Sequence, residues 1–359
     1  MSTPITRRDA LKTVAAAVLL PCAGGLAADR PAKIRIGQLG TAHAHASGKM
    51  DALRSLTDLY EVAGIAEPIT GRQALVEKQK SYVGLKWLSE EALLSDESVK
   101  AVVVETTLGD SARAALACLR AGKHIHLDKP GAETHADFKA VRLEAERRGL
   151  TVQLGYMLRY NPAFELLFRA HRAGWLGEIT EIDASIGKLA DARLQAQLAG
   201  LPGHGMFELA CHLVDAVVFL LGPPAVVHAF GQPTGLAPKG LPDNQLAVME
   251  YPKASVTLRC NHGDPFGGPH RRFHVAGTKG AMEIQPLESG RGTLYLSEAS
   301  GGFKKGENSL ALEVPAGRYD SEFRDLARVL RGEKRLAWSA EHDIAVHATV
   351  LRCAGLTPA

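Results

Sequence analysis

Several residue types are scarce in this sequence, and each shortage excludes a class of protein. Only 5 of the 359 residues are cysteine, and those beyond the N-terminal segment are widely spaced, so neither a structural disulfide nor a cysteine-based metal site is predicted. An excess of one charge is also lacking, because 42 lysines and arginines balance 39 acidic residues. No basic patch indicates binding to nucleic acid. Internal repeats and low-complexity segments are absent as well, which leaves an ordinary globular chain of two domains.

Residues 1–28 are predicted to be a twin-arginine signal peptide. The paired arginines Arg7 and Arg8 precede an apolar run, Thr13–Leu20, which is too short to span a bilayer, and small residues ending at Ala28 follow it. An ordinary amphipathic helix is the alternative. The twin-arginine route exports folded proteins, so we expect a periplasmic or secreted protein that acquires a cofactor before export. We expect no stable membrane association afterwards.

The first domain, residues 33–155, is predicted to be α/β, with a doubly wound parallel sheet. Short apolar strands alternate with helices, and Val99–Glu105 is almost wholly apolar, as expected for a strand covered on both faces. Strands are predicted at Lys33–Leu39, Tyr60–Ala66, Val99–Glu105, His124–Leu127 and Thr151–Gly155, and helices at Ala46–Leu56, Ser111–Ala121 and Thr134–Arg148.

The second domain, residues 156–359, is predicted to be α+β, with a large, mostly antiparallel open sheet. Its segments are longer and alternate between apolar and polar residues. Strands are predicted at Glu178–Lys188, Ala225–Gly231, Gln245–Glu250, Ser255–Asn261, Arg272–Gly277, Ala281–Pro286 and Thr293–Leu296, and helices at Pro162–Ala173, Met206–Leu221, Arg318–Gly332 and Ala340–Leu356. The last two helices are expected to pack back onto the sheets, and Ala299–Gly306 is interpreted as a loop.

A glycine turn is expected after the first strand, within Gly37–His45. Gly40 matches the first glycine of the Gly-x-Gly-x-x-Gly pattern of dinucleotide-binding folds, but Ala42 and His45 occupy the other two glycine positions. The N-terminus of the following helix remains an anion site. Glu67 ends the second strand, where a carboxylate accepts ribose hydroxyls and repels a 2′-phosphate, which favours NAD over NADP. An acidic turn residue is the alternative interpretation of Glu67.

The histidines His43 and His45 also allow a metal site. Two ligands do not complete such a site, and no acidic residue or cysteine lies close to them in the sequence. His124 and His126 of the neighbouring strand could contribute from the same sheet edge. Clustered histidines more often form a hydrogen-bonded polar lining, so no metal is predicted.

A lysine ends the strand within Gly122–Pro130. Pro130 stops the strand and holds Lys129 at its C-terminal end, the edge at which open α/β sheets bind ligands. An ammonium held there can donate a proton to a substrate oxygen, or accept one if burial or a neighbouring charge lowers its pKa. A solvated lysine at the end of a strand is the alternative.

Further along, Glu208 and His212 are spaced four apart within a predicted helix, and Asp215 lies near the same face. A carboxylate beside a histidine can orient it as a general base, although such a pair can also simply stabilise a helix. Arg159 follows the last parallel strand, where it could bind an acidic substrate or pair with a carboxylate.

The order of these elements resembles the Gfo/Idh/MocA oxidoreductases over almost all of the chain beyond the predicted signal peptide. The most specific parts are Gly122–Pro130 and Phe207–Gly222. In that family, a lysine and an acid-plus-histidine pair catalyse hydride transfer between a sugar or cyclitol hydroxyl and NAD(P). The resemblance therefore implies that Lys129, Glu208 and His212 are catalytic, with His212 taking the hydroxyl proton and Lys129 polarising the same oxygen.

The resemblance also implies the binding residues. Asp215, Arg159 and His204 are predicted to bind substrate, and Asp215 could instead hold His212. The predicted cofactor-binding residues are Gly40, Thr41, Ala42, His43, His45, Glu67, Thr106, Thr107, Asp128 and Lys129. A homo-oligomer formed through the C-terminal sheet is implied too.

Three positions depart from the family pattern. Asp128 stands before the lysine in place of glutamate, Glu208 replaces aspartate, and the glycine turn is degraded. Taken together, the sequence predicts an exported enzyme that transfers a hydride between a sugar or polyol hydroxyl and a tightly held NAD, because free NAD is scarce outside the cytoplasm. One alternative is a glycoside-cleaving enzyme that oxidises its substrate transiently. Another is a non-redox carbohydrate-binding protein that has lost its nucleotide.

Overall fold

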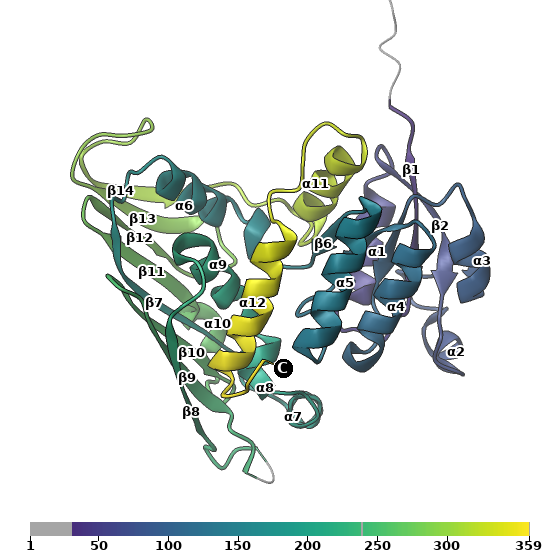
Figure 1. Cartoon of the computed structure of the whole chain (residues 1–359), viewed down its shortest axis with the longest axis horizontal. Coiled ribbons are helices and arrows are strands. Elements are labelled where there is room, and N and C mark those ends of the chain that lie inside the picture. Colours follow the sequence, from purple (N-terminus) through teal and green to yellow (C-terminus); the bar gives the residue numbers. More distant parts are fainter. Residues whose placement is uncertain (1–30, 238–239, 359) are drawn as a thin grey trace, which may run out of the picture. The chain divides into compact units, whose positions relative to one another are not determined.

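Alternating strands and helices in the first part of the chain build a six-stranded parallel sheet (Figure 1). The structure, a computed structural model, describes residues 31–237 and 240–358, so the predicted signal peptide lies outside the described residues. The strands run in the order β3-β2-β1-β4-β5-β6 and pair in parallel. They are β1 (Ile34–Leu39), β2 (Tyr60–Ala66), β3 (Trp87–Leu88), β4 (Ala101–Val104), β5 (His124–Leu127) and β6 (Val152–Leu154), connected by α1 (Ala46–Ser55), α2 (Arg72–Val76), α3 (Glu90–Ser95), α4 (Leu108–Arg120) and α5 (His135–Arg148).

Three of these strands end level with one another. Leu39 of β1 pairs with Val104 of β4, which pairs with Leu127 of β5. The residues that follow these strand ends therefore meet at one edge of the sheet, which is the ligand-binding edge of doubly wound folds.

The second part of the chain forms an eight-stranded sheet in the order β14-β13-β12-β11-β7-β10-β9-β8. All neighbouring strands are antiparallel except β7 and β10. The strands are β7 (Ile179–Gly187), β8 (Val226–Gln232), β9 (Asn244–Glu250), β10 (Ser255–Asn261), β11 (Arg272–Gly277), β12 (Gly280–Ile284), β13 (Arg291–Leu296) and β14 (Gly306–Ala311). The predicted fold class, a parallel sheet followed by a larger and mostly antiparallel one, is confirmed.

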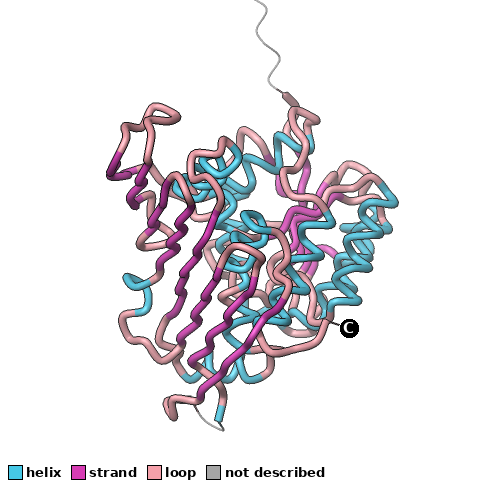
Figure 2. Tube along the Cα trace, turned by 60° about the vertical axis from the view of Figure 1, so that its left-hand side comes forward, coloured by secondary structure: helices cyan, strands magenta, loops and turns pink. Residues whose placement is uncertain are grey.

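Helices α6, α9 and α12 lie against one face of this larger sheet (Figure 1), and Figure 2 turns its other face toward the viewer. The helices of this part are the 3-10 helix η1 (Met157–Tyr160), α6 (Pro162–Arg172), α7 (Ala192–Ala199), α8 (His204–Glu208), α9 (Cys211–Leu221), α10 (Gly267–His270), α11 (Asp320–Leu330) and α12 (Ala340–Cys353). No helix within the described ranges, 31–237 and 240–358, is long and apolar enough to cross a membrane.

The last two helices pack back onto the earlier part of the chain, as expected. From α11, Phe323 and Leu326 join Ile36 of β1 in one apolar cluster, and the backbone carbonyl of Phe323 accepts a hydrogen bond from the Tyr60 hydroxyl at 2.6 Å. α12 contacts α5 beside the first sheet, and also α9 and β8 of the second part. The hydrophobic core therefore continues from one sheet to the other.

Candidate active site

The turn after β1 requires a glycine at its start. Gly40 has φ +85°, and a Cβ at this position would lie 2.8 Å from the backbone nitrogen and Cα of Thr106. Further along the turn, the N–H groups of Ala42 and Ala44 donate to no acceptor within the described part of the chain. Both alanines line a hollow of about 300 Å³, here called the turn hollow. Free N–H donors before a helix suit a pyrophosphate, so the turn fits a dinucleotide although Ala42 replaces a glycine.

The carboxylate of Glu67 fastens this turn to the end of β2. Its Oε2 accepts hydrogen bonds from the N–H and the hydroxyl of Thr41, at 2.8 and 2.5 Å, and its Oε1 accepts one from the N–H of Ile69 at 2.9 Å. The side chain is only 1% exposed. Glu67 therefore already has donors on both oxygens, and its first role here is to hold the turn in shape.

A second hollow, of about 450 Å³ and here called the outer hollow, lies beside Glu67 and shares Thr106 and Thr107 with the turn hollow. Three carboxylates line it, those of Glu67, Glu90 and Asp110. The only cation in its lining is Arg113, which is ion-paired with Glu90 and Asp110 at 2.7 and 2.6 Å. An acidic lining of this kind repels a 2′-phosphate and accepts ribose hydroxyls, as expected for NAD.

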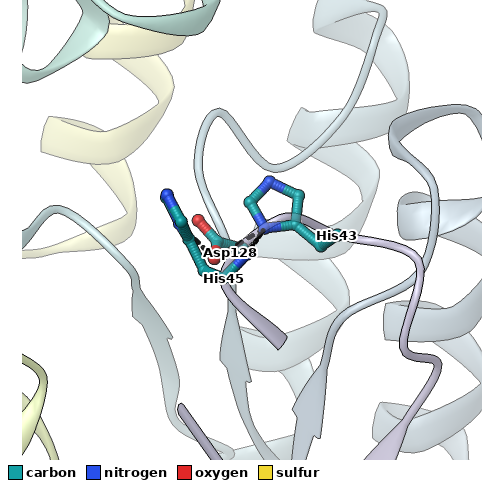
Figure 3. Close-up of side chains that lie close together, drawn as sticks. All are labelled: His43, His45 and Asp128. Atoms are coloured by element: carbon teal, nitrogen blue, oxygen red, sulfur yellow. Dashed lines mark hydrogen bonds and ion pairs between the residues drawn. The ribbon is translucent and has the colours of Figure 1, made fainter. Parts of the chain in front are cut away.

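Five side chains meet beneath the turn and are called the turn cluster: His43, His45, Lys49, Glu105 and Asp128. Oδ2 of Asp128 lies 3.0 Å from Nδ1 of each histidine (Figure 3) and 2.7 Å from Nζ of Lys49. Glu105 adds a second buried carboxylate, 3.2 Å from Nζ of Lys49 and 3.4 Å from Nδ1 of His43. Burial opposes a charge on His43, but Asp128 and Glu105 outweigh it and raise its pKa to about 9, so this imidazole is protonated at neutral pH.

The turn cluster adds an acidic residue, Asp128, to the two histidines, which a local scan of the sequence around them did not supply. Asp128 is distant in sequence, yet its carboxylate and the two imidazoles place three potential metal ligands within 4.8 Å of one another. The Lys49 ammonium already binds the same oxygen, and a divalent cation would meet that buried positive charge. We therefore describe the cluster as ion-paired side chains. His124 accepts a hydrogen bond from a backbone N–H, and His126 contacts Lys49, so neither adds a ligand.

Lys129 follows β5 and forms an ion pair with Glu208 of α8. Its ammonium donates to the backbone carbonyl of Glu208 and lies 3.2 Å from Oε1 of the same residue. Burial would lower the pKa of Lys129, but the attraction of Glu208 outweighs it and raises that pKa above its ordinary value. Burial likewise opposes the charge on Glu208, but Lys129 lowers its pKa to about 2. Lys129 therefore stays a cation that can donate a proton or hold a negative charge, and it is not a base.

The Lys129–Glu208 pair lies where two hollows meet. Both residues line the turn hollow, and both also line a third hollow of about 210 Å³, here called the inner hollow. His45 and His212 line the inner hollow as well, whereas His43 lines the turn hollow. The arrangement leaves space for a nucleotide on one side of the pair and for a small molecule on the other.

His212 faces the inner hollow as a neutral imidazole. Burial, and then the charge of Lys129, hold its pKa well below the ordinary value of 6.5. Its Nδ1 is buried and has no hydrogen-bond partner within residues 31–237 and 240–358. The single helix predicted for residues 206–221 is interrupted, since α8 ends at Glu208 and α9 begins at Cys211. Both Glu208 and His212 nevertheless reach the inner hollow.

Arg159 and Asp215, predicted to bind substrate, are instead buried against each other. Nη2 of Arg159 lies 2.6 Å from Oδ1 of Asp215 and 2.6 Å from Oδ1 of Asp343 in α12, and Nε donates to Oδ2 of Asp215 at 2.9 Å. Asp215 also bonds to His342, and not to His212 as expected. Neither residue lines the inner or the turn hollow, so their positions do not support the substrate-binding prediction, and Arg159 instead pairs with carboxylates, the alternative given for it. Two buried opposite charges satisfy each other here, which leaves neither free for a ligand.

His204 is also placed away from the inner hollow. Its Nδ1 bonds to the backbone carbonyl of Leu198 at 2.9 Å, and it lines a separate hollow beside α7. Its positive φ of 54° follows the sharp turn at Gly203 that begins α8. The substrate-binding prediction for His204 is therefore not supported by its position.

Charged residues that the sequence reasoning missed complete the inner hollow. Lys188, Arg271, Glu288 and Arg318 line it. Lys188 ends the predicted strand Glu178–Lys188, so attention to strand ends in the second domain as well as the first would have found it. The other three lie in connections, where no periodic pattern points to a site.

The comparisons with known proteins agree with this geometry. A family model described as an oxidoreductase family with an NAD-binding Rossmann fold, GFO_IDH_MocA, matches residues 34–156. A second model, the GFO/IDH/MocA C-terminal domain, matches residues 164–283. The two models of one family together cover more than half of the chain.

Individual relatives are distant. The chain is 30% identical over 197 residues to the uncharacterized oxidoreductase YhhX of Escherichia coli (strain K12), covering 54% of each protein, so it spans about half of that relative. It is 24% identical over 275 residues to the 1,5-anhydro-D-fructose reductase of Ensifer adhaerens, covering 75% of this chain and 80% of the reductase. A levoglucosan dehydrogenase solved with NADH and levoglucosan superposes with a TM-score of 0.75 at 16% identity, covering 90% of this chain and 98% of that one, and shares its fold.

Proposed function

The chain belongs to the Gfo/Idh/MocA family of NAD-binding oxidoreductases, and we propose that it transfers a hydride between a hydroxyl group of a sugar or polyol and NAD. One observation carries the proposal: Lys129 and Glu208 line both the turn hollow and the inner hollow. A reacting group in the inner hollow would lie beside the cofactor. The names of the reductase and dehydrogenase relatives support a carbohydrate as the substrate class.

The chain's own residues divide the proton chemistry between them. The nicotinamide supplies a ring carbon that accepts or returns the hydride. His212 is neutral and lines the inner hollow, so it can take the proton of the substrate hydroxyl. Lys129 stays charged and can stabilise the negative charge that develops on the same oxygen.

Glu208 acts in this scheme by positioning Lys129. Its carboxylate and its backbone carbonyl both accept hydrogen bonds from the ammonium, which leaves the lysine little freedom to turn away from the hollow. The pKa of Glu208 is about 2, so this side chain stays a carboxylate throughout the pH range in which the enzyme would work. Of the three predicted catalytic residues, Lys129 and His212 would therefore touch the substrate, and Glu208 would hold Lys129 in position.

The turn residues would hold the nucleotide. The free N–H groups of Ala42 and Ala44 and the protonated His43 place positive charge in the turn hollow, which suits a pyrophosphate. Export as a folded protein with NAD already bound is part of the proposal. It is supported by the paired arginines Arg7 and Arg8, which precede a short apolar run.

The test begins with the full chain, expressed in a bacterial host and purified without added nucleotide. Mass spectrometry of the small molecules released on denaturation is expected to find NAD or NADH at close to one per chain, in protein recovered from the periplasmic fraction. The proposal fails if no nucleotide is released and none binds when NAD is added.

The catalytic assignment is tested by Lys129→Met, with Lys139→Met on the exposed face of α5 as the matched control. Reduction of NAD is followed at 340 nm with a panel of sugars and polyols. We expect Lys129→Met to lower kcat by roughly 10²–10⁴-fold, because the developing charge loses its partner. The control should keep its activity. Equal activity in the two variants would contradict the assignment.

A further inference from the structure

The inner hollow carries more positive than negative charge. Four cations line it, namely Lys129, Lys188, Arg271 and Arg318, and only two carboxylates, those of Glu208 and Glu288. The two histidines in its lining do not offset this excess, because burial lowers the pKa of both His45 and His212 and leaves their rings neutral. The hollow is therefore positive at neutral pH.

The pairing of these charges shows which cations are in excess. Lys129 is neutralised by Glu208. Glu288 is shared by two guanidinium groups, since its Oε1 contacts Arg271 and its Oε2 lies 2.6 Å from Nη1 of Arg318. Lys188 makes no hydrogen bond and no ion pair through its ammonium with any residue that the structure describes. One charge of the arginine pair and the charge of Lys188 are thus in excess, because the carboxylate of Glu208, which attracts Lys188 from a distance, is already paired with Lys129.

We propose that the substrate is an anionic carbohydrate, whose acidic group is bound by Lys188 and Arg271 while its reacting hydroxyl lies at Lys129 and His212. This inference rests on the proposed function and adds the chemical class of the substrate. The shared chemistry is a negatively charged oxygen group, either the carboxylate of a sugar acid or the phosphate of a sugar phosphate. A guanidinium beside an ammonium suits either, because Nη2 of Arg271 is not engaged by Gly187 or Glu288 and can donate, and the ammonium adds a mobile point charge.

The backbone places the two cations together. Nε of Arg271 donates to the carbonyl of Gly187, the last residue of β7, at 3.0 Å, and Lys188 is the next residue of the chain. The side chain of Arg271 is only 15% exposed and is further held by Glu288, so its position is fixed before a ligand arrives. Arg271 is held at the end of β7 and Lys188 is the next residue after this strand, so an anion bound by both cations would relieve the repulsion between them.

The size of the hollow restricts the substrate as well. At about 210 Å³ it is smaller than the pockets of roughly 300–1,000 Å³ that hold drug-sized ligands. Apolar side chains, among them Met157, Ile186 and Leu287, form the rest of the wall and suit the carbon face of one sugar ring. A single acidic sugar fits this combination of size and charge.

The experiment measures binding and turnover separately. Isothermal titration calorimetry of the NADH-loaded full protein compares D-glucuronate, D-glucose 6-phosphate and D-glucose, which differ only at carbon 6. We expect at least one anionic sugar to bind at least tenfold more tightly than D-glucose, and the better of the two identifies carboxylate or phosphate as the acidic group. Raising the salt concentration should reduce this preference.

Substitutions locate the anion site. Lys188→Met should weaken binding of the anionic sugar by roughly ten- to hundredfold and leave D-glucose within about twofold, because a hydrogen bond to a charged group is lost. Lys188→Glu should weaken it further. Because the Lys188 ammonium has no ion-pair partner among the described residues, replacing it leaves no buried carboxylate without its counter-ion, so both variants should fold. The matched control is Lys305→Met, an exposed lysine in the loop before β14, which should change neither affinity.

The outcomes separate this inference from the proposed function. Binding of anionic sugars that depends on Lys188, without reduction of NAD by any of the three, would support the anion site and refute the redox function. Oxidation of D-glucose with an affinity equal to that for the anionic sugars would keep the function and overturn the inference. An anionic preference that survives in Lys188→Glu would overturn the inference as well.

Discussion

Lys49 is the side chain whose removal should most disturb the turn beneath the nucleotide. It lies on α1 with its side chain fully buried, and its ammonium is 2.7 Å from Asp128 and 3.2 Å from Glu105. The substitution Lys49→Met keeps most of the volume of the stem and removes the charge. Both carboxylates would then stay buried with the protonated His43 as their remaining counter-ion.

The size of the effect follows from the cost of an unpaired buried charge. Removing one partner of a buried ion pair costs about 3–5 kcal/mol, and here two carboxylates share the one lysine. Part of that cost is relieved at low pH. Lys49 is one of the charges that, together with His43, hold the pKa of Asp128 down against the effect of burial, so its loss raises this pKa relative to the parent and the carboxyl of the folded variant is neutralised at a higher pH. The loss of stability should therefore be largest near pH 8 and smaller near pH 5.

The assay is thermal unfolding followed by circular dichroism at both pH values, with Lys139→Met on the exposed face of α5 as control. At about 2.1 cal/mol/K of unfolding entropy per residue, a loss of 3–5 kcal/mol in a chain of this length corresponds to a fall in Tm of roughly 4–7 °C, whereas the control should move by no more than about 1 °C. The reasoning is refuted if Lys49→Met and the control have the same Tm at pH 8, or if the fall in Tm of Lys49→Met is as large at pH 5 as at pH 8.

Two further predictions concern other buried charges. Burial raises the pKa of Glu322 to about 8 from an ordinary value of 4.5, and neither of its carboxyl oxygens is hydrogen-bonded within the described ranges. Between about pH 4.5 and 8 this group is ionised in the unfolded chain but still protonated in the folded protein, so the folded protein loses stability as the pH rises through that range. Glu322→Gln should therefore stabilise the protein by about 1–3 kcal/mol at pH 8 and by little at pH 4.5, and urea titrations with no gain at pH 8 would contradict this. Arg159 outweighs burial and lowers the pKa of Asp215 below its usual range, a stabilisation that is present at neutral pH and lost as the pH falls below about 4. Asp215→Asn should cost about 2–4 kcal/mol at pH 7, and this cost should shrink only as the pH falls below about 4 toward the lowered pKa of Asp215, with sugar affinity at pH 7 unchanged within about twofold; a large loss of affinity in calorimetry would restore Asp215 as a substrate ligand.

Much of the fold could be predicted because its signals are local. β2 and β5 have the predicted bounds, since Tyr60–Ala66 and His124–Leu127 are short apolar runs between polar or glycine residues. Two of the elements that were not predicted illustrate different causes. β14, Gly306–Ala311, contains glycine, asparagine and serine and is stabilised by pairing with β13 at the edge of the sheet. α7 has a local signal that was overlooked, because Asp191 caps its first turn and helix-forming residues follow.

The same distinction between local and long-range signals applies to the site residues. Lys129 and the glycine turn follow strand ends, and any parallel sheet brings such residues to one edge, so their neighbourhood could be predicted. The partner of Arg159 could not, because Asp343 lies far along the chain and its approach depends on how α12 packs. Lys188 and Arg271 could not be predicted for a similar reason. Residues that line a hollow from separate connections are not spaced by any regular interval in the sequence.

The final helix also bears on how this protein can be recombined. Asp343 of α12 binds Arg142 of α5 at 3.2 Å, and His347 of α12 bonds to the backbone carbonyl of Ala132 at 3.0 Å. The last helix is therefore bound to the part of the chain that forms the first sheet. A chimera that takes its first sheet from a relative would therefore bury an aspartate opposite a foreign surface. An exchange of cofactor preference between relatives is therefore better made by substitutions around Glu67 than by transplanting the whole nucleotide-binding half.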